Sequence, residues 1–434
     1  MQDILRKIEG RVDSAEVFYV DSHSTEIGFE GWKIKSSSVL QKEGYSLRVV
    51  KNGKIGMAAT TDSNGIDRMI ENAIATAEFG EKVDIEFPGK SEFKRPKIFD
   101  PALTELSIED LISYGRIFIR FCERYRGSAD LDFGVQKSIS EVQIANTSGF
   151  HDGYKKSVLS WGGGLNRVKQ NDVFMVGDGS GSTSLPDMEA ELKKLTDPFH
   201  EKMALADNLL TVSSGKIPIV FSPRGTMVVM LPIQAAINGR SVYTGTSPLV
   251  GKEGEKLFDD KFSVIDDGTL DNRLGSSPFD DEGMPKRQIE IVDGGVFKNF
   301  IFDLVTGARA GRKSNGCGER GIFNASSPSL SNLAISPGNT SYEDMLGSIE
   351  EGIFIDGVLG LGQGNIIAGS FSNPVGTAFK IENGKLVGRV KNASISGNIY
   401  NDMKEIAAIG DEQELVYGSF LTPHIRLDTI NVAC

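Results

Sequence analysis

Hydrophobic and polar residues alternate through much of the first 60 residues, and this two-residue period predicts β-strands. An Asn-Gly pair at 52–53 separates two of these stretches, where a tight hairpin turn needs residues that tolerate positive φ. We therefore expect antiparallel strands near the start of the chain. The predicted elements are a short helix at 1–10 and strands at 16–20, 25–30, 45–50 and 55–60.

The segment 66–79 changes to a helical period, with apolar residues three and four positions apart. Residues 81–101 are polar and carry three prolines, so they are expected to form a loop. Ser107 is a favourable N-cap residue followed by two acidic residues, which predicts a helix to about residue 124. The next predicted elements are strands at 131–144 and 157–168 and a charged helix at 188–208.

From residue 216 onward, short apolar runs separated by Gly turns dominate the pattern. The predicted elements are a strand at 216–222, an apolar helix at 225–238, and strands at 288–292, 296–303, 352–361, 377–382 and 385–390. The whole pattern predicts an α+β fold with two domains. The N-terminal domain (1–210) is expected to have an antiparallel sheet with flanking helices, and the C-terminal domain (211–434) to be mostly antiparallel β.

Composition narrows the class of protein. The chain has 434 residues, 39% of them hydrophobic and 24% charged, as in globular proteins of two or three domains. A net charge of −12 without a dense basic block disfavours direct nucleic-acid binding. Three widely spaced cysteines are typical of reduced thiols in a cytoplasmic protein. No apolar run approaches 18 residues, so no membrane association is expected.

One short motif begins like a zinc-binding H-E-x-x-H helix. It reads HEKMA at 200–204, with Ala204 in place of the second His. A single His cannot build that site, and the motif lies on a charged helix. The sequence therefore favours a solvated helix face here.

Two loops carry clustered functional groups. The run Asp280-Asp281-Glu282 lies between a Pro and a Gly, and could bind a cation or cap a turn; the turn is favoured. The run ARAGRKSNGCGERG at 308–321 is rich in Gly and basic residues, which is typical of backbone that approaches another chain closely. The candidate residues for lining a cavity or an interface shared with another chain are Asp280, Asp281, Glu282, Arg312, Lys313, Cys317 and Arg320.

Several segments of the C-terminal half share their order and spacing with one known family. They read SSPFDDEGMPKRQIEIVDGGVFKNFIFDLVTGARAG (276–311), SNGCGERG, FKIENGKLVGRVKNASISGN (379–398), IAAIGDE and YGSFLTPHIRL (417–427). The N-terminal strand hairpin and VQIANTSGF (142–150) are also similar. Nearly the whole chain therefore resembles the TldD/PmbA (TldD/TldE) family.

This resemblance implies a dimeric metallopeptidase. In the family, a TldD-like subunit holds zinc with H-E-x-x-x-H on a helix and a cysteine near the C-terminus. A PmbA/TldE-like subunit lacks the zinc motif and completes an enclosed chamber. The assembly cleaves unfolded or extended peptides.

The chain resembles the second kind of subunit. The resemblance places Met230 at the first His position, Leu231 at the Glu and Ala235 at the second His, while Tyr417 replaces the cysteine. The whole stretch 208–252 contains no Asp, Glu, His or Cys. We therefore expect no catalytic or metal-binding residue and no cofactor in this chain. Zinc is expected in a TldD-like partner, with an unfolded peptide as substrate.

Two alternatives remain open. The chain could be a self-sufficient homodimer that binds or modulates another protein, in keeping with an older family label that refers to DNA gyrase. It could also be a hydrolase that uses Cys317, whose Gly, Lys and Arg neighbours could lower the pKa of the thiol.

Overall fold

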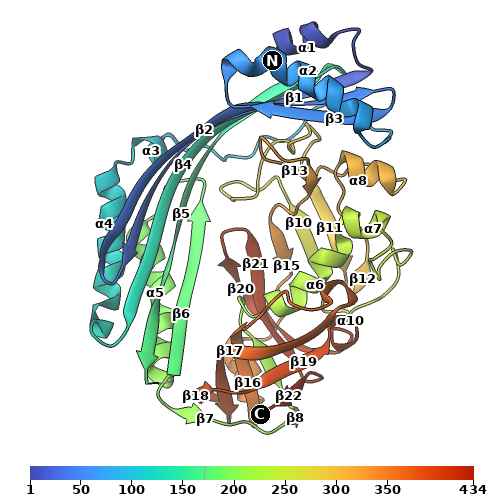
Figure 1. The fold of residues 1–434 in the computed structure, drawn as a ribbon. Coiled ribbons are helices and arrows are strands. Elements are labelled where there is room, and N and C mark those ends of the chain that lie inside the picture. Colours follow the sequence, from blue (N-terminus) through green and yellow to red (C-terminus); the bar gives the residue numbers. More distant parts are fainter. Residues whose placement is uncertain (171) are drawn as a thin grey trace.

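The N-terminal part of the chain forms a six-stranded antiparallel sheet in the order β3-β2-β1-β4-β5-β6 (Figure 1). The computed structural model describes residues 1–170 and 172–434. The strands are β1 (Ser14–Glu30), β2 (Lys33–Lys51), β3 (Lys54–Thr60), β4 (Asp130–Asn146), β5 (His151–Lys169) and β6 (Asp172–Ser182).

Several of these strands are longer than the sequence predicted. The strands expected at 16–20 and 25–30 are one continuous strand, β1, and β2 begins at Lys33 rather than 45. Every side chain from 33 to 43 is exposed, so this stretch has no buried face to create a hydrophobic alternation. β6 was not predicted.

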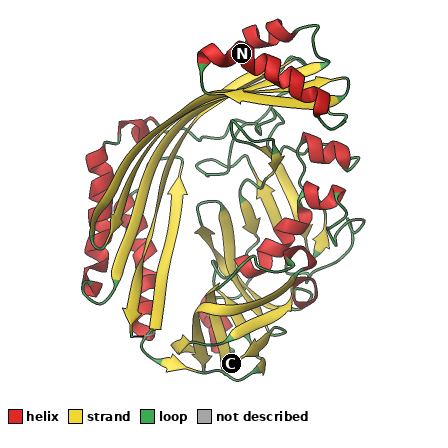
Figure 2. Cartoon of the chain, viewed as in Figure 1, coloured by secondary structure: helices red, strands yellow, loops and turns green. Residues whose placement is uncertain are grey.

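Helices cover only parts of this sheet, as Figure 2 shows. They are α1 (Gln2–Ile8), α2 (Ile66–Phe79), α3 (Pro101–Glu105), α4 (Ile108–Cys122) and α5 (Met188–Leu205). The 66–79 helix was predicted to the residue, and the Ser107 side chain caps α4 by accepting from the backbone N–H of Asp110. α4 and α5 pack Phe118 and Phe199 against the sheet beside Phe133.

The C-terminal part is built on a curled fourteen-stranded sheet. Its strands are β7 (Leu209–Leu210), β8 (Gly215–Lys216), β9 (Ile219–Phe221), β10 (Val264–Asp267), β11 (Gln288–Asp293), β12 (Val296–Phe297), β15 (Leu333–Ile335), β16 (Glu351–Val358), β17 (Ser370–Glu382), β18 (Lys385–Val390), β19 (Ser394–Asn398), β20 (Ile406–Val416), β21 (Phe420–Leu427) and β22 (Asn431–Ala433). A separate ladder joins β13 (Gly318–Glu319) and β14 (Ser327–Pro328). The helices are α6 (Met227–Ile237), α7 (Gly239–Tyr243), α8 (Leu304–Arg309), α9 (Tyr342–Gly347) and α10 (Ile399–Asp402).

The α+β class is confirmed, with corrections in detail. Most pairs in the second sheet are antiparallel, but β9 pairs in parallel with β16, β15 with β21, and β7 with β18. The strand expected at 216–222 is divided into β8 and β9, because Pro218 lies between them and has no N–H for a ladder. The strand expected at 296–303 ends at Phe297, and the chain then leads into α8.

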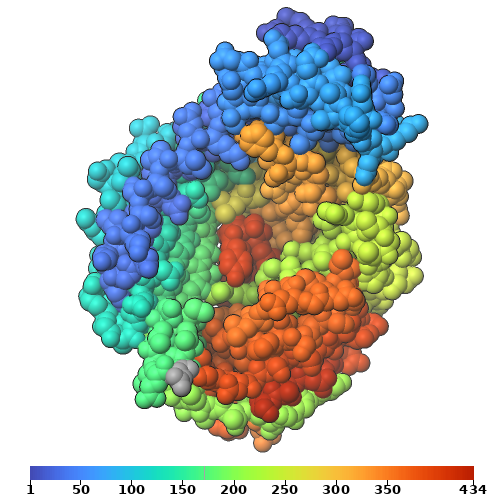
Figure 3. Space-filling model, in the orientation of Figure 1, coloured from blue at the N-terminus to red at the C-terminus, as the bar shows by residue number. Residues whose placement is uncertain are grey.

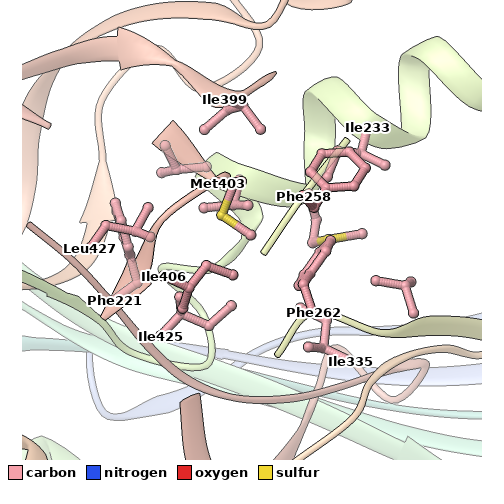
Figure 4. Packing of buried hydrophobic residues seen from close by; sticks show 14 of the residues in the cluster. Phe221, Ile233, Phe258, Phe262, Ile335, Ile399, Met403, Ile406, Ile425 and Leu427 are labelled. Carbon is pink, nitrogen blue, oxygen red and sulfur yellow. The ribbon is translucent and has the colours of Figure 1, made fainter. Parts of the chain in front are cut away.

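The main core of the C-terminal part lies between α6 and the curled sheet. Figure 4 shows Phe221, Ile233, Phe258 and Met403 within it. A second cluster contains residues of both parts of the chain, because Phe354 and Phe379 pack with the α4 and α5 side chains. The predicted domains at 1–210 and 211–434 therefore share part of their hydrophobic interior.

The two parts also meet along the outer edge of β6. Alternate carbonyl groups of an edge strand point away from its sheet and need donors. Side chains of the C-terminal part donate to three of them: Arg389 to Val173 (2.9 Å), Thr377 to Met175 (3.2 Å) and Arg224 to Gly177. This contact fixes the first sheet as one wall of a hollow that opens toward the viewer in Figure 3.

In the described residues, no helix is long and apolar enough to cross a membrane.

Candidate functional site

Two adjoining cavities form one groove. One has a volume of about 350 Å³ and the other about 290 Å³, and both are lined by Leu330, Ser331 and Ser419. The first cavity lies against α6 and the β20–β21 hairpin. The second reaches β5 and the loop that carries Asp280. The groove therefore brings together segments that are far apart in sequence.

The α6 helix presents one face to the groove. Met227, Gln234 and Asn238 line the first cavity, whereas Met230 is fully buried in the core behind them. Leu231 and Ala235 are half-buried. This helix is apolar almost all round, so packing rather than a polar face determines how it lies.

Tyr417 is at the turn between β20 and β21 and also lines the first cavity. Its φ is +52° and that of Gly418 is +74°, as a tight hairpin turn requires. Positive φ is uncommon for a tyrosine and is a form of strain that often accompanies function. Tyr417 is 54% exposed, and the Arg224 guanidinium lies 6.0 Å from the centroid of its ring. The hairpin therefore presents an aromatic surface to the groove.

This end of the groove does not fit a zinc ion. Zinc in proteins is held by imidazole, thiolate or carboxylate groups, and none is present at Met230, Leu231, Ala235 or Tyr417. Among the described residues, no three His, Cys, Asp or Glu side chains converge as metal ligands.

The second cavity has a charged lining. Lys156 donates to the carbonyl groups of Leu274 and Ser276, and burial lowers the pKa of its ammonium to about 8. Lys286 donates to the Ser331 hydroxyl over 2.9 Å. Asp280 and Asp281 also line this cavity, so the sequence candidates reach the groove here.

The acidic run at 280–282 is a structural turn. Asp280 accepts backbone N–H groups from Glu282, Met284 and Gly318, as the turn interpretation predicted. Burial, reinforced by the Glu282 carboxylate, raises the pKa of Asp280. Asp280 and Glu282 are buried and Asp281 is half-buried, so the run is not an exposed loop.

Glu282 belongs to a buried ion cluster that joins the two parts of the chain. Arg48 of β2 donates to Glu282 (2.7 Å) and to Glu16 of β1 (3.0 Å). Arg320 lies 2.7 Å from the same Glu16 carboxylate. These four side chains are almost completely buried. Glu282 and Arg320 therefore hold the N-terminal sheet against the C-terminal part.

The basic loop at 312–320 is divided between surface and interior. Arg312 pairs with Glu253 at the surface (2.7 Å), and Lys313 is exposed. Cys317 is buried, and burial raises the pKa of its thiol to about 12. The basic groups of Lys286 and Arg287 lower the pKa of the thiol, but by less than burial raises it. Cys317 is therefore a poor nucleophile, against the hydrolase hypothesis.

A further cavity, of about 380 Å³, contains residues that sequence reasoning missed. Lys202 of α5 pairs with Asp356 of β16 over 2.7 Å, and Asp356 accepts from Ser222 (2.8 Å). Burial alone would raise the pKa of Asp356, but Lys202 and Arg224 hold it below its ordinary value. His424 lines the same cavity. No short motif links these positions, which are distant in sequence.

The solvated helix face expected at 200–204 is therefore wrong in part. Lys202 is largely buried and Glu201 lines the cavity, while His200 contacts the Tyr125 hydroxyl over 3.2 Å. This part of α5 packs against the C-terminal part of the chain through the Lys202–Asp356 pair, so the charged residues of the helix are not all in solvent.

Comparison with known proteins agrees with this architecture. The model of the PmbA/TldA metallopeptidase C-terminal domain matches residues 214–434, and that of PmbA/TldA metallopeptidase domain 1 matches 15–77. An uncharacterized protein of Methanocaldococcus jannaschii is 26% identical over 418 residues, 94% of each chain. A metalloprotease of Methanothermobacter thermautotrophicus is 24% identical, over 96% of this chain and 92% of its own.

Solved structures show the same fold. TldE from Thermococcus kodakarensis superimposes with a TM-score of 0.91 at 22% identity, over the whole of both chains. A putative modulator of a DNA gyrase from Thermotoga maritima gives 0.88 at 20% identity, over 100% of this chain and 99% of its own. With a family model spanning half of the sequence, the chain belongs to the PmbA/TldD metallopeptidase family.

Proposed function

We propose that this chain is the PmbA/TldE-like, non-zinc subunit of a cytoplasmic two-subunit metallopeptidase that processes unfolded peptides. The observation that carries the proposal is α6. At the positions where the resemblance expects the metal ligands and the general base, this helix has Met230, Leu231 and Ala235. A TldD-like partner would supply the zinc, the activated water and the Glu base.

The role of this chain is then to bind and orient the peptide. The two cavities share lining residues and continue into one another, so the groove can take an extended chain. Gln234 and Ser329 can exchange hydrogen bonds with a peptide backbone, and the Tyr417 ring can stack on a side chain. The inner face of the N-terminal sheet would confine the substrate.

Co-expression with a TldD-like subunit that carries H-E-x-x-x-H tests the first part of the proposal. We expect a complex that contains zinc by elemental analysis and cleaves an unfolded polypeptide, and no zinc in this chain alone. Peptidase activity of this chain alone, undiminished by a chelator, would contradict the proposal. Failure to form any complex would favour the self-sufficient homodimeric modulator instead.

The groove is tested within that complex. Ser329→Trp should fill the first cavity and raise the KM for peptide at least tenfold, while the zinc content stays unchanged. Ser128→Trp, in an exposed turn away from the groove, is the matched control. Equal KM values for the two variants would show that the groove does not hold the substrate.

A further inference from the structure

The cavity of about 380 Å³ beside α5 has no role in the proposed function, although its volume is typical of small-molecule sites. Both parts of the chain line it. Asp178 of β6 and Glu201 of α5 come from the N-terminal part, and Phe354 of β16 and His424 of β21 from the C-terminal part. In the described part of the chain, the cavity shares no lining residue with the groove.

The cavity and the groove lie on opposite faces of the N-terminal sheet. Asp178 is two residues from Val176 in β6 and therefore projects from the same face, where Val176 packs in the cluster that contains α4 and α5 side chains. Lys156, which lines the groove, is five residues from Trp161 in β5. Trp161 belongs to the same cluster as Val176, so Lys156 projects from the other face.

The lining of the cavity has an excess of negative charge. It contains seven carboxylates but only two cationic side chains, and these two, Lys202 and Arg224, already pair with Asp356 at 2.7 and 3.9 Å. The other carboxylates belong to Asp178, Glu201, Glu343, Asp411, Glu412 and Glu414. Partial burial, together with the nearby carboxylates of Asp178 and Asp356, raises the pKa of Glu414. A cationic occupant would relieve this repulsion.

The carboxylates are spread around the cavity instead of meeting at one point. Glu201 is on α5, Glu343 on α9 and Glu414 on β20. Among the residues that the structure describes, no three acidic, His or Cys side chains converge as metal ligands. Since a metal ion needs several oxygen ligands at one point, the arrangement fits an extended molecule with several positive charges better than an ion.

One wall of the cavity is aromatic. The ring centroids of Tyr342 and His424 are 4.7 Å apart, and that of Phe354 is 6.0 Å from His424. Within the described chain, neither the Tyr342 hydroxyl nor the His424 ring has a side-chain hydrogen-bond partner. Aromatic faces attract ammonium groups and pack against methylene groups. The cavity therefore offers apolar surface and unpartnered polar groups beside its carboxylates.

We propose that this cavity binds a small organic polycation of the polyamine class. Its methylene segments would lie against the aromatic wall, and its ammonium groups would pair with Glu201, Glu343 and Glu414. Because both parts of the chain line the cavity, an occupant would also hold the two parts together. This inference does not depend on the proposed peptidase role.

Titration calorimetry of the full chain with spermidine, at constant ionic strength, tests the site. We expect saturable binding to a single site, and at least tenfold weaker binding in Glu414→Gln and in Glu201→Gln. Glu9→Gln removes an exposed negative charge outside the cavity and should bind spermidine as the wild type does. Absence of saturable binding, or equal affinities of Glu414→Gln and Glu9→Gln, would contradict the proposal.

A second ligand distinguishes a free polyamine from the lysine side chain of another protein. N-acetyl-lysine amide has one ammonium group and can reach only one of the separated carboxylates, so it should bind at least tenfold more weakly than spermidine. Equal or tighter binding of the lysine amide would overturn the polyamine assignment. Since a ligand of the folded state stabilises it, spermidine should also raise the Tm of the wild type more than that of Glu414→Gln.

Discussion

The ring of His424 illustrates how tertiary packing changes the chemistry of a single residue. It lies 4.7 Å from the Tyr342 ring and 6.0 Å from the Phe354 ring, measured between centroids. Burial lowers the pKa of this imidazole to about 4, although Asp356 acts in the opposite direction. The position in the sequence, Thr-Pro-His-Ile, gives no sign of this environment.

This pKa predicts a loss of stability in mild acid. The folded protein keeps His424 neutral down to about pH 4, whereas the unfolded chain takes up a proton near pH 6.5. Unfolding therefore binds a proton as the pH falls through this window, which favours the unfolded state. Between pH 7 and pH 5 the protonation of His424 alone should lower the free energy of unfolding by an amount on the order of 1–2 kcal/mol.

The measurement is urea unfolding of the wild type and His424→Gln at several pH values. The variant should lose less stability over the same window. With only four histidines in the chain, NMR can also follow the His424 ring directly. A ring that titrates near pH 6.5 in the folded protein would disprove the burial argument.

At the scale of elements, a helix or strand could be predicted where its own residues show a hydrophobic period or a capping residue. The helix at 66–79 has a helical apolar period, and Ser107 offers a cap that the structure uses. Strands β2 and β6 were missed in whole or in part, because the exposed half of β2 and the Gly-rich end of β6 have no alternation of buried residues. Their positions depend on pairing with distant strands.

Two ion pairs of α5, one buried and one exposed, allow the effect of burial on an ion pair to be compared within one helix. Lys202–Asp356 is buried, with side chains 18% and 5% exposed, whereas Lys193–Asp197 on the same helix is mostly exposed. Asp356→Asn leaves the Lys202 charge without its partner and should lower the free energy of unfolding by about 3 kcal/mol. Asp197→Asn should cost less than about 0.5 kcal/mol. Equal effects in urea unfolding would show that Lys202 is effectively solvated.

At the scale of the whole molecule, the buried Arg48 cluster connects the N-terminal sheet to the C-terminal part. Arg48→Met leaves Glu16 and Glu282 buried without their shared partner, and should cost about 3–5 kcal/mol. Arg11→Met, at a solvent-exposed pair with Glu71, should cost less than about 1 kcal/mol. Chemical unfolding measures both.

A double variant separates the charge effect from simple loss of packing. Arg48→Met combined with Glu282→Leu removes the carboxylate that Arg48→Met leaves without a cationic partner, since Glu16 keeps Arg320, and should recover part of the stability lost in Arg48→Met. No recovery would mean that the cluster acts through shape rather than charge.

The sequence by itself determined the class of fold, the longer helices, the family and the absence of metal-ligating side chains at 208–252, because these depend on local period, residue type and motif order. Only the tertiary structure decided what the charged candidates do. Asp280, Glu282 and Arg320 lie in the interior and Arg312 at the surface, and Lys202 meets Asp356 across the two parts. Burial and the pairing of residues far apart in sequence set these roles, and neither is encoded in a short stretch of residues.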